Sequence, residues 1–355
     1  MSTKQFLFYF SITLFFIFII SCKDKITGPC SNGGNILCYE KPYNNHWEIF
    51  TNNISGSNPQ NISNYADDNE YPQWSPEGRY IVYSRSVSIN GPLVIVYDTK
   101  NKTEFNLTSD GGGASQMPQW LPNGKVCFGY PFFWAPYKGT YIMNPDGTNK
   151  KKILDSVATI YFYQDSYTFL YVDGTNNVYK TNIDGTVNEF VYYLGTLNQY
   201  VAIQGFNPFT EELLISLKTT DSTDAIALYN INTKNVNILL ASEKGYAFGQ
   251  LRYSRDFSKI AFVEIETASK KYDEEYLSVL ENGKKRRLVK LTGDEWFDYN
   301  PMQFSYDGRY IAFSKNIYQS GQWVSWKSYL YVVDASNGTL HYIDEGISAS
   351  WNPHP

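Results

Sequence analysis

Acidic side chains gather at two points of the sequence where they could do acid–base chemistry. The two groups are Asp67, Asp68 and Glu70, and Asp294, Glu295 and Asp298. A pair of carboxyl groups can hydrolyse a glycosidic bond when roughly 5–9.5 Å separates them. Carboxylates in turns are, however, more often solvated surface groups, and spacing along the chain does not give their separation in space. A catalytic carboxylate pair and a solvated surface therefore both stay open.

The other residues with catalytic potential are three histidines, His46, His341 and His354. They are far apart in the chain, and neither a His-Glu-x-x-His nor a Cys-x-x-Cys spacing occurs, so we predict no metal site and no cofactor. A Gly-x-Ser-x-Gly motif, which carries the nucleophile of α/β-type serine hydrolases, is also missing from the sequence. We predict that the protein is not an enzyme.

Aromatic residues are concentrated in segments that we expect to be loops, mainly residues 130–138 and 316–328. Loops are normally polar, so indole rings there indicate either a binding surface or a small packed cluster. Trp and Tyr dominate protein interfaces, and their flat faces also suit sugar rings. Both interpretations stay open. The candidate ligand-binding residues are Phe133, Trp134, Tyr137, Trp296, Phe297, Asp298, Trp323 and Trp326.

These candidates lie in segments between the copies of a phrase that the chain repeats seven times. Its clearest copies are residues 71–83 and 303–313, in which an aromatic residue is followed by a tight turn and then by an apolar, β-rich run. A period in the forties with several strands in each unit is typical of a β-propeller. The aromatic anchors of the seven copies are Trp74, Trp120, Phe162, Phe206, Tyr253, Phe304 and Trp351.

Each repeat reads as four strands, A to D, with the anchor at the end of strand A. Residues 35–63 supply strands B, C and D before the first complete repeat, whereas Trp351 ends a strand A that no strand B follows. We therefore predict an all-β fold, a seven-bladed β-propeller of four-stranded antiparallel blades. It is closed by pairing the N-terminal strands with the C-terminal strand, which removes two open sheet edges.

The repeated phrase resembles that of TolB-type β-propellers, which are WD40-like sheets found in periplasmic TolB and beside the catalytic domain of prolyl oligopeptidase relatives. The resemblance covers roughly residues 36–355 and is strongest around Trp74, Trp120 and Phe304. It is weaker around Phe162 and Phe206, whose turns lack glycine. It implies the architecture and not the activity, because one propeller scaffold hosts unrelated functions. TolB carries a further α/β domain that we do not find here, so a Tol-Pal role is not expected.

Residues 1–22 have the pattern of an export signal. Lys4 precedes the apolar run Phe6–Ile20, which is too short for a comfortable membrane span of ~20 residues. The run ends in Ile19-Ile20-Ser21-Cys22, which resembles the lipobox of bacterial lipoproteins. In that family the chain is cleaved before the cysteine, whose sulfur then receives a lipid carrying acyl chains such as palmitate. An ordinary secretory peptide or an N-terminal anchor helix is the alternative.

The lipobox resemblance implies a division of the chain into a signal peptide (residues 1–21), a lipidated tether (residues 22–35) and the propeller (residues 36–355). Cys22 would attach the protein to a membrane. Because Lys23 and not an aspartate follows Cys22, we expect an outer-membrane lipoprotein, with the periplasmic or the surface-exposed side undetermined.

The remaining cysteines and the charge give weaker signals. Cys30 and Cys38 lie eight residues apart in an exported chain, so a disulfide between tether and first strand is a hypothesis. Cys127 occupies a core position of its repeat, and we expect a buried, unreactive thiol. The formal net charge is −5 without strong basic blocks, and we therefore expect no nucleic-acid partner.

Taken together, these patterns favour a monomeric, lipid-anchored β-propeller of the cell envelope that recognises a protein or a glycan through its aromatic loops. A polysaccharide-active enzyme, a lyase or hydrolase that uses carboxylates near the channel mouth, is the alternative. A purely structural role in an envelope complex is the third possibility, and the sequence does not identify a ligand.

Overall fold

The computed structural model describes residues 36–87, 91–109, 117–130, 138–173, 175, 177–193, 201–219, 223–267, 274–298, 300, 302–319 and 325–354. Every regular element in these ranges is a β-strand. The strands form seven separate sheets. Among the described residues, no helix has the length and apolar character needed to cross a membrane.

The strands of each sheet are named A to D from the centre of the ring outwards. In blade one, strand A is the last strand of the chain, and strands B to D are the first three: β29 (Ile347–Trp351), β1 (Ile36–Tyr43), β2 (His46–Asn53) and β3 (Gln60–Asn61). Blade two consists of β4 (Asn69–Trp74), β5 (Tyr80–Arg85), β6 (Leu93–Asp98) and β7 (Thr103–Asn106).

Blades three to five follow in chain order with the same A-to-D arrangement. Blade three consists of β8 (Gln119–Trp120), β9 (Val126–Tyr130), β10 (Gly139–Met143) and β11 (Lys151–Leu154). Blade four consists of β12 (Thr159–Phe162), β13 (Thr168–Val172), β14 (Asn177–Asn182) and β15 (Asn188–Tyr193). Blade five consists of β16 (Val201–Asn207), β17 (Glu212–Lys218), β18 (Asp224–Asn230) and β19 (Val236–Ala241).

The last two blades have the longest strands. Blade six consists of β20 (Tyr246–Tyr253), β21 (Lys259–Glu266), β22 (Glu274–Glu281) and β23 (Lys284–Thr292). Blade seven consists of β24 (Glu295–Phe297), β25 (Gln303–Phe304), β26 (Tyr310–Gln319), β27 (Ser325–Asp334) and β28 (Leu340–Glu345). Its strand A is divided, because β24 and β25 both pair with β26.

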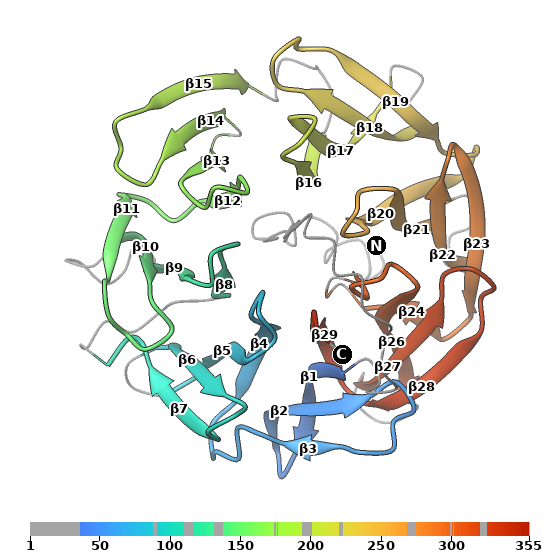
Figure 1. Ribbon diagram of the computed structural model, residues 1–355. Coiled ribbons are helices and arrows are strands. Elements are labelled where there is room, and N and C mark those ends of the chain that lie inside the picture. The colour runs from blue at the N-terminus through green and yellow to red at the C-terminus, as the bar shows by residue number, and fades with distance from the viewer. Residues whose placement is uncertain are drawn as a thin grey trace.

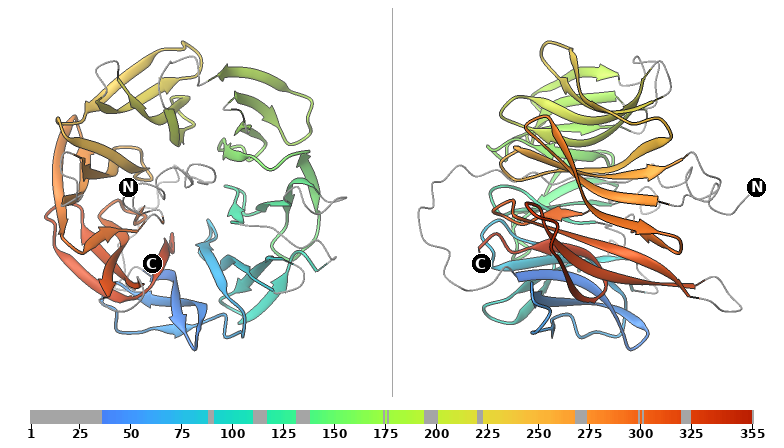
Figure 2. Two further views of the ribbon diagram at one scale, coloured as in Figure 1. Left: turned by 180° about the vertical axis from the view of Figure 1, so that it is seen from behind. Right: turned by 90° about the vertical axis from the view of Figure 1, so that its right-hand side faces the viewer.

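The seven sheets stand in a ring, with strand A of each blade nearest the centre and strand D on the rim (Figure 1). This arrangement confirms the predicted all-β, seven-bladed propeller of four-stranded antiparallel blades. In the two views of Figure 2, the ring is seen from behind and from its side. In the side view, the end of the red β26–β27 pair extends beyond the ring on the side away from the C-terminus.

The repeated phrase forms strand A and the turn that leads to strand B. In its clearest copies the hydroxyl of Ser75 accepts a hydrogen bond from the Tyr80 N–H (2.9 Å), and the hydroxyl of Ser305 does the same for Tyr310 (2.9 Å). Gly78 and Gly308 complete these turns with φ of +69° and +66°, a conformation that glycine adopts without steric cost.

Two weaker copies keep this turn without the glycine. Ser166 and Phe257 lie four residues after their anchors, as Gly78 does, and have φ of 53° and 60°. A left-handed conformation is costly for residues that carry a Cβ. The resemblance to the family phrase therefore fades in these repeats although the backbone shape is kept.

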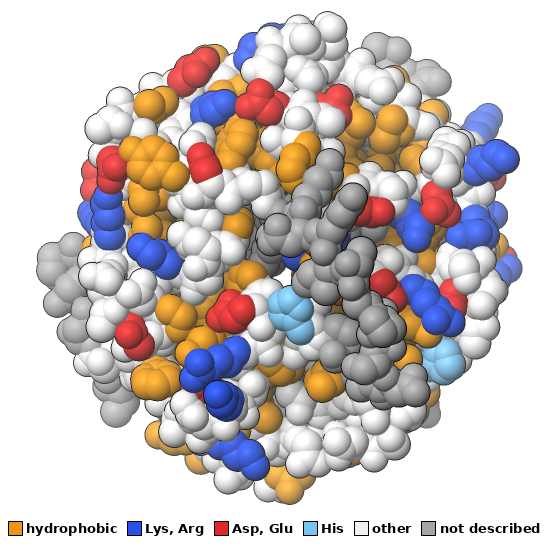
Figure 3. Space-filling view, viewed as in Figure 1, with side chains coloured by type: hydrophobic (Ala, Val, Ile, Leu, Met, Phe, Trp, Pro, Cys, Tyr) orange, Lys and Arg blue, Asp and Glu red, His pale blue; other side chains and the backbone are white. Residues whose placement is uncertain are grey.

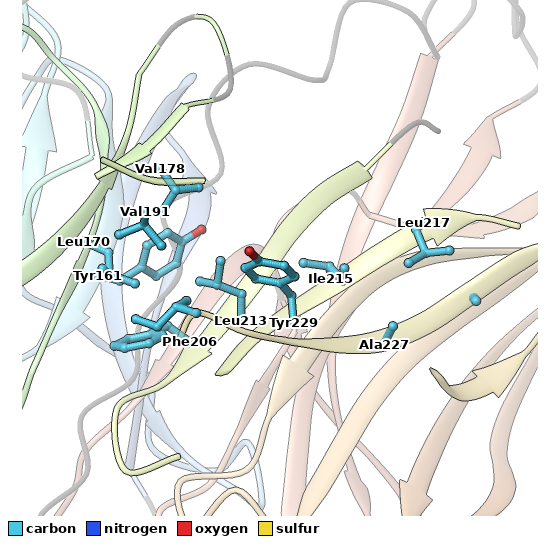
Figure 4. Close-up of a cluster of buried hydrophobic side chains, with 12 residues drawn as sticks. Tyr161, Leu170, Val178, Val191, Phe206, Leu213, Ile215, Leu217, Ala227 and Tyr229 are labelled. Carbon is cyan, nitrogen blue, oxygen red and sulfur yellow. The ribbon is translucent and has the colours of Figure 1, made fainter. Parts of the chain in front are cut away.

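Apolar side chains between neighbouring blades form the core. The anchor indoles face the preceding blade, since the Nε1–H of Trp120 donates to the Gln73 carbonyl and that of Trp351 donates to the Gln303 carbonyl, both at 3.0 Å. Figure 4 shows one such cluster, in which Phe206 of blade five packs against Tyr161 of blade four. Because every blade is buried against two others, the ring is one continuous core divided by sheets.

Pairing of β29 with β1 closes the ring. Leu37 lies opposite Trp351 and Cys38 opposite Ser350 in an antiparallel register. The predicted closure is confirmed, including the origin of strands B, C and D of this blade in the N-terminal segment.

The two described cysteines are both buried and free. Burial raises the pKa of the Cys127 thiol to about 12, which agrees with the expected unreactive side chain. Cys38 lies buried inside blade one, and the hypothesised disulfide stays a prediction. Its suggested partner Cys30 and the lipidation candidate Cys22 lie outside the described residues, so the tether and the lipid stay predictions.

Closure should contribute a large part of the stability, and Trp351 offers a test. Its side chain is 7% exposed and lies in the cluster between blades one and seven. We expect Trp351→Ala to lower the free energy of unfolding by about 3–5 kcal/mol, since the cavity forms where the ring closes. The measurement is chemical denaturation of both proteins.

The matched control is Trp326→Ala, which removes an indole that is 55% exposed. It should change the free energy of unfolding by no more than about 0.5–1 kcal/mol. Equal losses in the two variants would contradict the importance of the closure.

Candidate functional site

The antiparallel strands place two kinds of connection on each face of the ring. The B-to-C hairpins and the D-to-A connections lie on one face, which we call the hairpin face. The A-to-B turns, such as Ser75–Gly78, lie on the opposite, turn face together with the C-terminus. Figure 3 views the turn face, where acidic and basic side chains are interspersed around the ring. Of the binding candidates from the sequence, Trp296 and Trp326 lie at the hairpin face, at this end of blade seven.

Three aromatic residues of blade seven meet on the hairpin face, and we call them the aromatic group. The ring centroid of Trp296 lies 4.7 Å from that of Tyr318 and 6.3 Å from that of Trp326. The register of the strands explains the meeting, because Tyr318 lies directly opposite Trp326 in the β26–β27 hairpin and β24 pairs alongside β26. The aromatic group thus stands on paired strands, which hold its rings more rigidly than a loop would.

The aromatic group is both packed and exposed. Trp296 contacts two other rings, whereas Trp326 keeps more than half of its side chain open to solvent. The structure thus shows packing within the aromatic group together with an exposed indole, and recognition of a ligand stays a prediction. An exposed indole that is held in place by a second indole offers a flat apolar surface at low entropic cost, as hot-spot residues do.

Phe297 is a buried member of the candidate set. Its side chain is buried between blades six and seven, where its ring contacts that of Phe313 at 5.5 Å. Phe297 thus packs in the core, and its role as a ligand-binding residue stays an untested prediction. In β24 neighbouring side chains point to opposite sides, so Trp296 and Phe297 cannot both face a ligand.

Asp298 connects the strands of the aromatic group to the neighbouring blade six through hydrogen bonds. One of its carboxylate oxygens accepts hydrogen bonds from the backbone and side-chain N–H groups of Asn300, each at 2.7 Å, and the other accepts one from Asn316 (2.9 Å). Its main-chain carbonyl accepts a bond from Gln250 of blade six at 2.6 Å. Both carboxylate oxygens are engaged within the protein, so Asp298 positions the base of the hairpin.

The other aromatic candidates, Phe133, Trp134, Tyr137 and Trp323, lie outside the described residues. They stay predictions.

A buried acid that sequence reasoning missed lies near Asp298. Glu40, on β1, is only 2% exposed, and its carboxyl accepts a hydrogen bond from the backbone N–H of Tyr71 at 2.7 Å. Burial raises the pKa of Glu40 to about 8, although the Tyr71 bond opposes the shift, and the charges of Glu70 and Asp298 raise it further. At neutral pH, Glu40 is therefore mainly a neutral acid that can donate a hydrogen bond or a proton.

Carboxyl groups from two other blades thus act on Glu40 of blade one: Glu70 of blade two and Asp298 of blade seven. The pKa of Glu70 is also raised, by burial first and then by Asp68. Of the acidic groups predicted from the sequence, the structure links Asp68, Glu70 and Asp298 in this way. The described residues contain no cluster of three or more His, Cys, Asp and Glu side chains that could hold a metal ion.

The comparisons with known proteins rest on structure. No protein-family model matches the sequence, and no curated protein matches it. TolB from Acinetobacter baumannii is similar in structure with a TM-score of 0.50 at 14% identity, over 90% of this chain and 66% of the TolB chain. An oligogalacturonate lyase in complex with manganese has a TM-score of 0.57 at 11% identity, over 88% of this chain and 85% of the lyase.

A prolyl endopeptidase is also similar, with a TM-score of 0.58 at 9% identity, over 86% of this chain and 46% of the peptidase. The chain is a seven-bladed β-propeller whose fold is shared with TolB, as its repeated phrase predicted. At these identities the likeness shows the fold alone, and the neighbours include both enzymes and TolB.

The raised pKa of Glu40 leads to a pH-dependent stability. Folding favours the protonated acid, so its stabilising contribution is complete below the ordinary pKa of 4.5 and is lost as the pH rises through about 8. We expect Glu40→Gln to equal the wild type near pH 4. Near pH 9 the variant should be more stable by an amount on the order of a few kcal/mol. Denaturation at a series of pH values measures the difference.

Glu77→Gln is the control, because Glu77 is an exposed carboxylate on the turn face. The free energy of unfolding of Glu77→Gln should equal that of the wild type at every pH. A Glu40→Gln profile parallel to that of the wild type would show that Glu40 does not titrate in this range.

Proposed function

We propose that the protein is a recognition module of the cell envelope, which binds an extended glycan or polypeptide on its hairpin face. The observation that carries the proposal is the aromatic group, with Trp326 exposed and held by Trp296 on rigid strands. The apolar indole face supplies stacking or burial for a ligand.

The attachment to a membrane belongs to this proposal. The lipobox-like Cys22 and the tether that follows it would hold the ring close to the outer membrane, where glycans and envelope proteins are at high effective concentration. Mass spectrometry of the protein from its native cells would test the attachment, which requires a mature chain that begins with an acylated Cys22.

Binding should depend on Trp326. We expect Trp326→Ala to leave the fold intact and to weaken binding by about 2 kcal/mol, or roughly 30-fold in Kd, because truncating a central indole removes stacking that no neighbour replaces. The ligand is found with a glycan array and, in parallel, with a crosslinking pull-down from intact cells, and the affinity of each variant for it is then measured.

Phe209→Ala is the matched control. Phe209 is an aromatic residue of similar exposure (48%) between strands A and B of blade five, on the turn face. This variant should bind as tightly as the wild type. Wild-type affinity in Trp326→Ala, or equal losses in both variants, would remove the aromatic group from the proposed function.

A second candidate, a polysaccharide-active enzyme, is favoured by one observation. Glu40 is a neutral acid at pH 7 with two further carboxyl groups nearby, which is the environment of a general acid. The oligogalacturonate lyase with a similar fold makes glycans a reasonable substrate class to test.

The two candidates respond differently to Glu40→Gln. Cleavage of a bound glycan should disappear in this variant if Glu40 is a catalytic acid, while binding through Trp326 continues. Asp298→Asn is a poor test, because both oxygens of Asp298 are used to hold Asn300 and Asn316.

A further inference from the structure

Arg252 carries a buried charge that lacks a counter-ion. Its side chain is 7% exposed on β20, the inner strand of blade six. Nη1 donates to the Leu251 carbonyl (2.9 Å) and lies 3.5 Å from the Gln204 carbonyl. Within the described part of the chain, Nε and Nη2 have no hydrogen-bond acceptor and no carboxylate lies within 4.0 Å of the guanidinium.

The partners of Arg252 place its guanidinium on the inner wall of the ring. Gln204 belongs to β16, the inner strand of blade five, and Tyr161, which interacts with the charge, belongs to β12, the inner strand of blade four. The Arg252 side chain thus crosses the boundary from blade six to the inner strand of blade five, and Tyr161 of blade four acts on its charge electrostatically. The centre of the ring is the side that these inner strands share.

Arg252 directly precedes the anchor of its blade. At the equivalent position of blade five, Gly205 makes room for the ring of the anchor Tyr253, whose Cδ2 would lie 3.2 Å from a Cβ there. The residues that precede the seven anchors are Gln73, Gln119, Tyr161, Gly205, Arg252, Gln303 and Ser350. Arg252 is the one charged member of this set.

Other polar groups of the same set also lack partners. Oε1 of Gln73 and Nε2 of Gln119 are buried without a hydrogen bond. Buried polar groups are nearly always satisfied in proteins, so unsatisfied ones call for water or a ligand. Among the seven residues, Arg252 alone adds a positive charge without a counter-ion in the described part of the chain.

An unpaired buried charge is expensive unless something compensates it. Burial lowers the pKa of Arg252 to about 10, which still leaves the side chain charged at neutral pH. The guanidinium fork matches the two oxygens of a carboxylate, whereas a dianionic phosphate would leave one negative charge unbalanced beside a single arginine.

We propose that Arg252 is the anchor of an anion site on the inner wall of the ring, which takes the carboxylate of a small organic acid. Nε and Nη2 donate to the two carboxylate oxygens, and the Nη1 bond to Leu251 holds the plane of the guanidinium. This site is separate from the aromatic group, so it does not depend on the proposed function.

The experiment measures thermal unfolding of the full chain, purified in detergent, in increasing concentrations of sodium succinate. Succinamide, the neutral diamide of the same acid, and sodium chloride are the parallel probes. We expect a saturable rise in Tm with succinate, no rise with succinamide, and a smaller, non-saturable effect of chloride. A chloride response as large as that of succinate would overturn the assignment to organic carboxylates.

The variants are Arg252→Gln and Arg255→Gln. Arg255 lies in the turn that follows β20, and its guanidinium carbon lies 3.4 Å from the ring centroid of Tyr306. Both variants lose one positive charge, so general salt effects are equal. We expect the apparent Kd for succinate to rise about tenfold or more in Arg252→Gln, as for the loss of a charge-assisted pair. In Arg255→Gln it should stay within about twofold of the wild type.

The stability of the variant without succinate separates a binding role from a structural one. Removal of an unpaired buried charge should leave the Tm of Arg252→Gln equal to or above that of the wild type. A protein that fails to fold, or a large fall in Tm, would contradict the proposal by making Arg252 a structural residue. Equal affinities of wild type and Arg252→Gln, or of wild type and Arg252→Lys, which lacks the planar fork, would overturn it as well.

Discussion

The pairing of β29 with β1 is the constraint on which the rest of the structure depends. Without it, blades one and seven would each lose a neighbour, and the inner edge of β1 would be an open sheet edge, which invites aggregation. The two ends of the sequence meet in a single sheet, and Trp351 reaches into blade seven from there. Glu70 and Asp298 act on the buried Glu40 because this closure brings blades one, two and seven together.

Architecture could be predicted from the sequence because each repeat carries local information. The aromatic anchor, the turn and the apolar run recur often enough to count blades, and the incomplete repeats at both ends indicate the closure. Even Ser166 and Phe257 fit this account, since the tertiary structure forces the turn where the local sequence does not favour it. The geometry of a blade can thus be predicted from short segments of the sequence, without knowing which residues pack against them in space.

The candidate site could be predicted only in part, because burial depends on neighbours that are remote in the chain. Trp296 and Trp326 were visible as aromatic residues in polar surroundings, but Phe297 looked the same and proved to be core. Glu40 is an ordinary strand residue by sequence, and its raised pKa comes from its place between blades. The buried, unpaired state of Arg252 could not be predicted from the sequence either, because it depends on strands of other blades.

The aromatic group faces solvent, whereas the buried ionisable groups lie inside the ring. We propose that the ligand binds on the hairpin face. The most direct measurement incorporates a photo-crosslinking phenylalanine analogue at position 326 or, on the turn face, at position 209, and irradiates intact cells. We expect a discrete adduct with a single glycan or polypeptide from position 326 and no adduct from position 209. No adduct at position 326, or the same adducts from both positions, would contradict ligand binding on the hairpin face.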